Sequence, residues 1–367
     1  MHGNRILIAL DSVGVDPLGH DRSESVYGES RFLFPRGARG EVMELPAAPR
    51  PGILVETDVT EGADCGAIEC AITYTSIFSG QSAIREHGLM RGLGLKDRLL
   101  EQMVSRDNLF RRFDRCCLAN AIFPAHLAFL GDSCVQGILP QFSREAVEGK
   151  LRFDGRPVAF KGTAKNGFAE LFTLAELNQN IFVYAARQAD VKLRTWNDVR
   201  RGEALTSSMT HELESRFDVA FFDQAPLPPR APEEAAEVLV RLAADHDFTF
   251  YKYQIPDLVS HTGRVELARA VFAVIERFVE AVLKSAAGST TVIVTSDHGH
   301  LEQLASSRGH PKSNVPTWYF GPEPERWSPL LKRPEGIFQV LTAGAAPRPS
   351  SQTASSARGL PPDRHAP

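Results

Sequence analysis

The stretch Thr290-Thr-Val-Ile-Val-Thr-Ser-Asp297-His298 is typical of a buried β-strand that ends in two residues able to bind a metal. Two other segments are built in the same way. The apolar run Ile6-Leu-Ile-Ala-Leu10 ends at Asp11, and the aromatic, β-branched run Phe248–Tyr253 is followed by Asp257. Ligands of open α/β sheets bind at the carboxyl ends of the strands, so this spacing predicts an α/β fold with one converging site.

The composition sets limits on the class of protein. The chain has 367 residues, 43% of them hydrophobic and 23% charged, which suits a globular α/β domain with or without a smaller insert. Its formal net charge of -4 argues against a nucleic-acid-binding protein. No apolar run approaches the roughly 20 residues needed to cross a membrane. The chain enters its first strand directly after Arg5, and we expect a cytoplasmic protein.

The five cysteines are odd in number, and their spacing fits neither a disulfide framework nor a Cys-x2-Cys zinc site. We therefore expect reduced thiols in the core. They are Cys65, Cys70, Cys116, Cys117 and Cys134.

Hydrophobic periodicity predicts the other elements. Residues 12–70 are rich in Gly and Pro and indicate long loops, and a helical pattern begins at Gly80. Apolar residues at three- and four-residue spacing predict a helix over Val265–Lys284, and Pro232 fits the first turn of a helix over Glu233–Ala244. The segment from Ala343 is rich in Pro, Ser, Ala and Arg without periodicity, which predicts a disordered tail.

The last third of the chain concentrates residues of the types that bind divalent metals. They form the patterns Asp257-x3-His261, Asp297-His298 and His310, and Asp11 lies far upstream. Carboxylates and imidazoles together hold metals such as zinc and manganese. Two such ions side by side form a clamp for phosphoryl or sulfuryl transfer. The sequence therefore predicts a two-metal enzyme.

These motifs, in this order, resemble the alkaline phosphatase superfamily. The nearest branch is that of the cofactor-independent phosphoglycerate mutases and phosphopentomutases. The matching segments are Ile8-Ala-Leu-Asp11-Ser-Val-Gly14, Asp257-Leu-Val-Ser-His261, Thr295-Ser-Asp297-His298-Gly299 and His310-Pro-Lys-Ser-Asn-Val-Pro316. The resemblance covers residues 245–322 well and the first 100 or so in patches. His300, after Gly299, departs from the Asn or Glu usual in relatives, and we expect it beside the ligands or at the surface.

The resemblance implies a ligand set and a nucleophile. One metal would be held by Asp11, Thr75, Asp297 and His298, and the other by Asp257, His261 and His310. The family also needs a hydroxyl or thiol nucleophile at a helix start, and Thr75 matches best, with Ser76 and Ser79 as alternatives. The metals would be Mn2+ or Zn2+, with Mg2+ less expected beside two imidazoles.

The resemblance also implies an architecture and an activity. We expect an alkaline phosphatase-like three-layer α/β sandwich with a mostly parallel central sheet and a small inserted cap or lid. Residues 1–105 and 245–342 would form the core, residues 106–244 would supply further core elements and the cap, and residues 343–367 would form the tail. The expected activity is hydrolysis of a small-molecule phosphate ester. The alternatives are a phosphomutase and a catalytically silent metal-binding relative, and the oligomeric state is left open.

Overall fold

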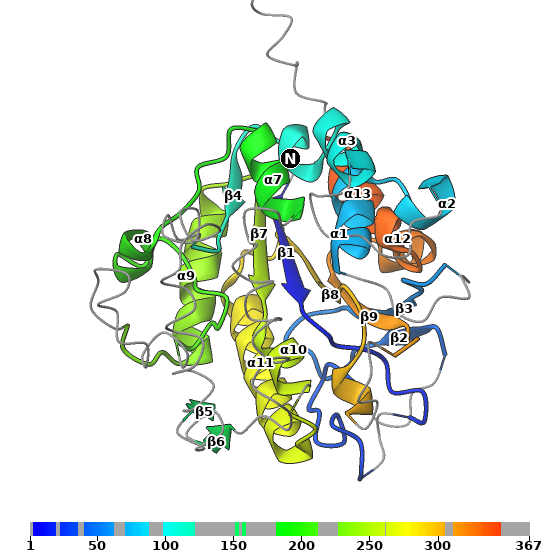
Figure 1. Cartoon of the computed structure of the whole chain (residues 1–367), viewed down its shortest axis with the longest axis vertical. Coiled ribbons are helices and arrows are strands. Elements are labelled where there is room, and N and C mark those ends of the chain that lie inside the picture. The colour runs from blue at the N-terminus through cyan, green and yellow to red at the C-terminus, as the bar shows by residue number, and fades with distance from the viewer. Residues whose placement is uncertain are drawn as a thin grey trace, which may run out of the picture.

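The structure is a computed structural model. It describes residues 3–19, 23–35, 40–61, 70–87, 98–121, 151–153, 156–158, 181–211, 227–260, 262–304 and 311–345. Helices surround a central sheet, and the first strand lies near the middle of that sheet (Figure 1).

The central sheet has seven strands and mixed direction. In spatial order they are β2 (Val42–Glu44), β3 (Ile53–Thr57), β9 (Val315–Phe320), β8 (Thr291–Ser296), β1 (Arg5–Leu10), β7 (Phe248–Tyr253) and β4 (Cys116–Leu118). The half formed by β8, β1, β7 and β4 is parallel, whereas β9, β3 and β2 join it through antiparallel pairs. A separate hairpin consists of β5 (Leu151–Phe153) and β6 (Arg156–Val158).

Helices cover both faces of this sheet. The α-helices are α1 (Cys70–Ser79), α2 (Ala83–His87), α3 (Arg98–Arg106), α7 (Ile181–Gln188), α8 (Trp196–Arg200), α9 (Pro232–Ala244), α10 (Ile255–Ser260), α11 (Val265–Ser285), α12 (Pro324–Leu331) and α13 (Pro334–Thr342). The described residues also form two short 3-10 helices, η2 (Leu109–Arg112) and η6 (Leu301–Gln303).

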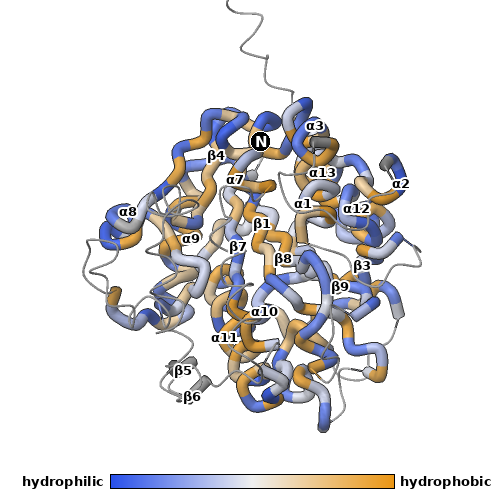
Figure 2. Tube along the Cα trace, in the orientation of Figure 1, coloured by the Kyte–Doolittle hydropathy of each residue, from blue (hydrophilic) through white to orange (hydrophobic). Residues whose placement is uncertain are grey.

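Alternate side chains of β1 enter two different apolar layers. Ile6, Ile8 and Leu10 pack with α9 and α11, whereas Leu7 and Ala9 pack with α1, α3, α7 and α13. All six residues of β1 are buried, as a parallel strand covered on both faces requires. Figure 2 shows the same distribution, with hydrophobic residues along the central strands and hydrophilic ones on the outer loops. The predicted three-layer α/β sandwich is therefore confirmed.

Most elements in the second half of the chain lie where periodicity placed them. Helix α11 begins at Val265, as predicted, and buries one stripe that includes Leu267, Val271, Ile275 and Phe278. Helix α9 begins at Pro232, whose fixed φ suits a first turn, and Glu234 accepts a hydrogen bond from the Ala231 N–H. Among the described residues, no helix has the length and hydropathy needed to span a bilayer.

The first hundred residues differ from expectation at two places. Residues 12–70 were predicted as long loops, but they contain β2 and β3, and β3 pairs with β9. The first helix was expected from Gly80, whereas α1 runs over Cys70–Ser79 and ends where Gly80 adopts φ 70°. Much of the predicted cap lies outside the described residues, so the cap stays a prediction. The same holds for residues 346–367 of the tail.

Candidate metal centre

The ends of three parallel strands lie level with one another. Leu10, the last residue of β1, is in register with Tyr253 of β7 and with Ser296 of β8. The chain leaves β1 at Asp11 and β8 at Asp297-His298, and β7 leads into α10, which carries Asp257 in its first turn. Parallel register therefore gathers these ligand-type side chains at one edge of the sheet.

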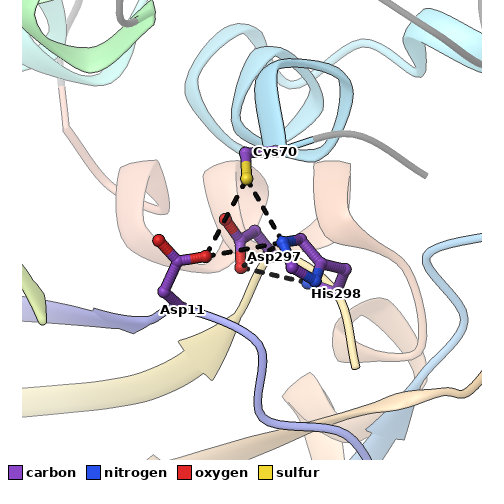
Figure 3. Close-up of side chains that lie close together, drawn as sticks. All are labelled: Asp11, Cys70, Asp297 and His298. Atoms are coloured by element: carbon purple, nitrogen blue, oxygen red, sulfur yellow. Dashed lines mark hydrogen bonds and ion pairs between the residues drawn. The ribbon is translucent and has the colours of Figure 1, made fainter. Parts of the chain in front are cut away.

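Four side chains form a compact group at this edge: Asp11, Cys70, Asp297 and His298 (Figure 3). One ligand atom from each lies within 4.8 Å of the others. The Sγ atom of Cys70 lies 3.2 Å from Nε2 of His298 and 3.8 Å from Oδ1 of Asp11. His298 Nε2 also lies 3.4 Å from Asp11 Oδ1. Cys70 comes from a different layer, because it is the first residue of α1.

The ring of His298 is oriented by its other nitrogen. Nδ1 lies 3.2 Å from the carbonyl oxygen of Gly299 and 3.2 Å from Oγ of Ser12. A proton on Nδ1 donated to the Gly299 carbonyl leaves the lone pair of Nε2 facing Cys70 and Asp11. Metal-binding histidines have the same arrangement, in which the nitrogen that does not bind the metal donates to a carbonyl or carboxylate.

Ser12 connects the group of four to Asp257. Its hydroxyl donates a short hydrogen bond to Oδ1 of Asp257, and its backbone N–H donates to Oδ1 of Asp297 at 3.3 Å. Ser12 has φ 68°, a left-handed conformation that is costly for a residue with a side chain. Such strained residues cluster at functional sites.

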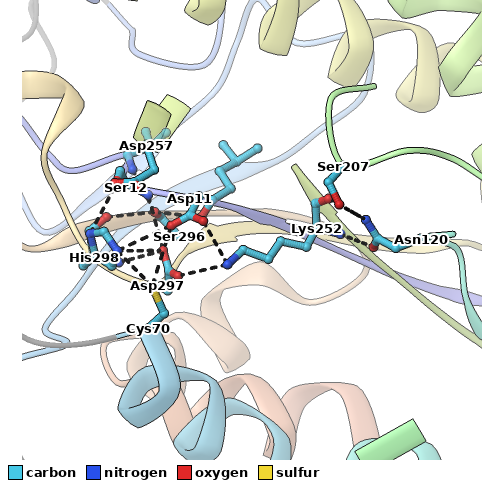
Figure 4. Close-up of polar contacts among 12 residues, drawn as sticks. Asp11, Ser12, Cys70, Asn120, Ser207, Lys252, Asp257, Ser296, Asp297 and His298 are labelled. Atoms are coloured by element: carbon cyan, nitrogen blue, oxygen red, sulfur yellow. Dashed lines mark hydrogen bonds and ion pairs between the residues drawn. The ribbon is translucent and has the colours of Figure 1, made fainter. Parts of the chain in front are cut away.

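A buried lysine lies beside the carboxylates (Figure 4). Lys252 is in register with Ala9 of β1, and its Nζ lies 2.9 Å from Oδ2 of Asp11 and 3.7 Å from Oδ2 of Asp297. The ammonium also lies 4.8 Å from the ring centroid of Tyr74 in α1, a cation–π contact. Asn120 holds the Lys252 backbone, accepting from its N–H and donating to its carbonyl, both at 2.8 Å.

The protein's own charges shift the pKa values of the group. Burial acts to raise the pKa of Asp11, but Lys252 and His298 outweigh it and the pKa is lowered. Burial and the neighbouring Asp11 raise the pKa of Asp297. Burial also acts to lower the pKa of Lys252, yet Asp11 and Asp297 outweigh it and the pKa is raised. Short contacts between the carboxylates and the ammonium thus keep charged groups in a buried site.

The pKa values of Cys70 and His298 are shifted as well. Burial raises the pKa of the Cys70 thiol to about 12, and Asp297 and Asp11 act in the same direction. Burial acts to lower the pKa of His298, but Asp297 and Cys70 outweigh it and the pKa is raised well above its ordinary value. A divalent cation would reverse both tendencies, since it favours the thiolate and the neutral imidazole.

The donor set fits a divalent metal. Oδ2 of Asp297 is buried and accepts no hydrogen bond from the described residues, with Lys252 Nζ 3.7 Å away. A buried carboxylate oxygen without a donor is costly, and a cation supplies what it lacks. Asp11, Asp297 and His298 would hold this metal, and Asp257 lies on the far side of Ser12, where the second metal is predicted.

Apart from Thr75, the predicted metal ligands divide into two sets. The structure brings Asp11, Asp297 and His298 together and places Asp257 next to them through Ser12. His261 and His310 lie outside the described residues, so their predicted roles stay predictions. His300 is buried, with Nδ1 4.0 Å from Oδ1 of Asp257, which fits a place beside the ligands rather than at the surface.

Thr75 and its alternatives lie further along α1. The Thr75 hydroxyl is buried and donates to the Ala71 carbonyl at 2.7 Å, and the Ser76 hydroxyl donates to the Ile72 carbonyl at 3.2 Å. Ser79 lies at the last position of the helix and donates to the Gln81 carbonyl at 3.3 Å. The residue at the helix start, facing the carboxylates, is Cys70.

Sequence reasoning missed Cys70, Lys252 and Ser12. The cysteine pattern predicts a core thiol at Cys70, although the resemblance implies a hydroxyl or a thiol as the nucleophile at a helix start. Lys252 is the one charged residue of the Phe248–Tyr253 run, and its place one residue before the end of that run was the available signal. Ser12 directly follows Asp11, but no sequence pattern predicts its left-handed φ.

A buried glutamate joins the loops around the site. Oε2 of Glu302 accepts from the N–H groups of Gly14 at 2.9 Å and His300 at 3.0 Å, and Oε1 accepts a short hydrogen bond from the Ser313 hydroxyl. A Cβ at Gly14 would lie 2.2 Å from Oε1 of Glu302, so only glycine allows this close approach. Glu302 thereby fixes the segments that follow β1 and β8.

Comparison with known proteins supports the resemblance. Residues 227–340 match the Metalloenzyme superfamily model. The chain is 34% identical over 97 residues to a 2,3-bisphosphoglycerate-independent phosphoglycerate mutase of Wolinella succinogenes, covering 26% of this chain and 20% of that protein. The corresponding protein of Syntrophotalea carbinolica is 37% identical over 99 residues, covering 26% of this chain and 18% of that protein. The predicted resemblance is confirmed, although the chain spans about a fifth of these relatives.

Two solved structures align with most of the chain at low similarity. The alkaline phosphatase from the Antarctic bacterium TAB5 aligns with 93% of this chain and 97% of its own, at 13% identity and a TM-score of 0.42. The PH0037 protein from Pyrococcus horikoshii aligns with 88% of this chain and 86% of its own, at 15% identity and a TM-score of 0.43.

Proposed function

We propose that this protein is a metal-dependent phosphoryl-transfer enzyme that hydrolyses a small-molecule phosphate ester. One observation carries the proposal: Asp11, Asp297 and His298 converge at the carboxyl ends of parallel strands, with Asp257 one hydrogen-bonded serine away. The motif match over residues 227–340 supports the same chemistry, since it includes Asp257, Asp297 and His298. Divalent metals bound there would neutralise the phosphoryl oxygens and stabilise the leaving oxygen.

The chain's own residues would hold and balance this centre. Asp11, Asp297 and His298 would bind one metal, and Asp257 with His261 and His310 the other. Lys252 keeps Asp11 ionised and in place through its 2.9 Å ion pair. Glu302 and Ser12 would fix the loops that carry the ligands, since both join segments distant in sequence. Rigid support of this kind is what a preorganised catalytic site needs.

The attacking group would come from α1. Thr75 was predicted for this role, and Cys70 has the stronger geometric support. Cys70 begins the helix and lies 3.2 Å from His298 Nε2, whereas the Thr75 hydroxyl donates to a backbone carbonyl inside the helix. A helix start also favours an anionic group. We therefore propose Cys70, which lies adjacent to the metal, as the attacking group and keep Thr75 as the alternative.

The test is turnover of p-nitrophenyl phosphate and bis-p-nitrophenyl phosphate by metal-stripped protein. Zn2+, Mn2+ and Mg2+ are added back in turn to wild type, Cys70→Ala and Thr75→Val. We expect metal-dependent turnover that falls by at least about 100-fold in Cys70→Ala, as loss of a group acting in the transition state does. Thr75→Val removes the hydroxyl at nearly constant shape, and we expect it to retain most of the turnover.

Two results would change this assignment. Turnover lost in Thr75→Val and retained in Cys70→Ala would return the role to Thr75, provided both variants melt cooperatively. Tight metal binding without hydrolysis of either ester would reject the hydrolase. Interconversion of 3- and 2-phosphoglycerate would then identify the mutase activity named for the relatives in Wolinella and Syntrophotalea.

A further inference from the structure

We infer that Cys70 binds the metal as a thiolate, so that the centre has one sulfur, one nitrogen and carboxylate oxygen ligands and selects zinc-like ions over manganese and magnesium. This inference rests on the proposed metal centre and specifies its chemistry. Thiolates favour zinc and other soft or borderline ions, whereas carboxylates and hydroxyls alone suit manganese and magnesium.

The geometry places the sulfur among the other ligands. Cys70 Sγ lies 3.2 Å from His298 Nε2 and 3.8 Å from Asp11 Oδ1, and all four ligand atoms lie within 4.8 Å of one another. Zinc binds sulfur at about 2.3 Å and nitrogen or oxygen at about 2.0–2.2 Å, so one ion between these atoms fits with small side-chain adjustments. Figure 3 shows the thiol pointing from α1 toward the three side chains below it.

A second observation, independent of the cysteine, points to a cation here. Asp297 is 0% exposed, and its Oδ2 accepts no hydrogen bond from the described residues. Its other oxygen accepts from the N–H groups of Ser12 and His298. Lys252 Nζ lies 3.7 Å from Oδ2, too far for a hydrogen bond, so one oxygen of this fixed carboxylate is left for a metal ion.

A Cys70 thiolate also fits the formal charges of this group of four side chains and Lys252. Asp11, Asp297 and a Cys70 thiolate supply three negative charges, and Lys252 supplies one positive charge at 2.9 Å from Asp11. A divalent ion supplies two more positive charges, which makes the buried group neutral.

Metal binding by Cys70 releases the proton of its thiol. The S–H bond of Cys70 breaks, the proton passes to solvent, and the sulfur lone pair forms the bond to the metal. No electron is transferred, and no co-reactant is needed.

Cobalt substitution tests the inference without relying on activity. The full chain is stripped with a chelator and titrated with Co2+, which gives a sulfur-to-metal charge-transfer band in the near ultraviolet only when a thiolate is bound. We expect this band in wild type and in Cys116→Ser, whose thiol contacts the Phe110 carbonyl instead. Cys70→Ser should lose the band while keeping the visible d–d bands of cobalt bound by oxygen and nitrogen.

Competition between ions gives the selectivity. Zn2+ and Mn2+ are titrated against a chromophoric chelator with wild type and Cys70→Ser. We expect the ratio of zinc to manganese affinity to fall by at least about 10-fold in Cys70→Ser, since even groups outside the ligand sphere change metal affinity by 10–100-fold.

The outcomes separate this inference from the proposed function. Cobalt d–d bands in wild type without the sulfur band would overturn the thiolate ligand and leave the metal enzyme standing. No cobalt binding by wild type would overturn both. Loss of the sulfur band in Cys116→Ser rather than Cys70→Ser would assign the sulfur elsewhere and reject Cys70.

Discussion

Lys252 is 3% exposed and lies between two carboxylates and an aromatic ring. Its ammonium neutralises part of the negative charge of these carboxylates, which the metals would otherwise have to balance alone. We expect Lys252→Met to destabilise the metal-stripped protein by about 3–5 kcal/mol, because a buried ion pair that loses one partner leaves an uncompensated charge. Saturating Zn2+ should recover more stability in this variant than in wild type, measured by urea unfolding with and without chelator.

The matched control is Lys192→Met. Lys192 pairs with Asp198 at 3.4 Å, but its side chain is 69% exposed, so its removal should cost less than about 1 kcal/mol. Equal losses in the two variants would contradict the role assigned to Lys252.

His211 supplies a pH dependence unrelated to the metal centre. It is buried with φ 62°, and its Nδ1–H donates to the Pro228 carbonyl at 2.9 Å. Burial and then Arg230 lower its pKa to about 4. The unfolded chain therefore takes up a proton on this residue below about pH 6.5 while the folded chain does not, and stability falls as pH falls toward 4.

His211→Asn removes this titration and keeps a residue that tolerates positive φ. Between about pH 7 and about pH 5, wild type should lose about 2 kcal/mol more of its free energy of unfolding than the variant does. Chemical unfolding at the two pH values measures the difference. Parallel losses in both proteins would show that His211 is protonated in the folded state.

At the scale of elements, helix α11 holds the loop that follows β1. The buried Glu276 accepts from the Ser30 hydroxyl at 2.7 Å and from the N–H groups of Arg31 and Leu33 at 3.0 and 3.1 Å. We expect Glu276→Ala to cost at least about 2 kcal/mol, because several buried donors lose their acceptor. Glu280→Ala, one helical turn later, removes only exposed ion pairs and should cost less than about 1 kcal/mol. Urea unfolding of both variants provides the comparison, and a similar loss in both would refute the anchoring role.

The elements also show what the sequence could and could not specify. Strands β1, β7 and β8 and helices α9 and α11 lie within a residue or two of prediction, because an apolar run or an amphipathic stripe marks each of them. Helix α1 was misplaced because eight of its ten residues are buried, which removes the periodic contrast between faces. Its true start at Cys70 decides which side chain meets the carboxylates, so the same error hid both the helix and the thiol.

Tertiary packing determined the rest of the site. The three metal-type ligands at the ends of β1 and β8 were predictable because parallel strands end at one edge of the sheet. Lys252 was not, because its burial depends on α1 packing over the same face of the sheet, where Tyr74 covers its ammonium. The helical pattern predicted from Gly80 left no turn to carry Cys70 to the site.

At the scale of the whole molecule, the centre joins parts of the chain that are far apart in sequence. Ser12 and His298 are in contact across 286 positions, and Cys70 adds a third segment. A metal bound there is linked to the global fold rather than to one loop.

Zinc at about 100 times its Kd should raise the free energy of unfolding by about 2.7 kcal/mol. Hydrogen exchange should slow together in β1, β8 and the first turn of α1, since all three must separate before the ion is released. Asp297→Asn should abolish this joint protection, whereas Asp247→Asn, which alters a surface pair with Arg115, should retain it. Protection confined to one of the three elements would mean that the ligands do not share an ion, because a shared ion ties the opening of each segment to that of the others.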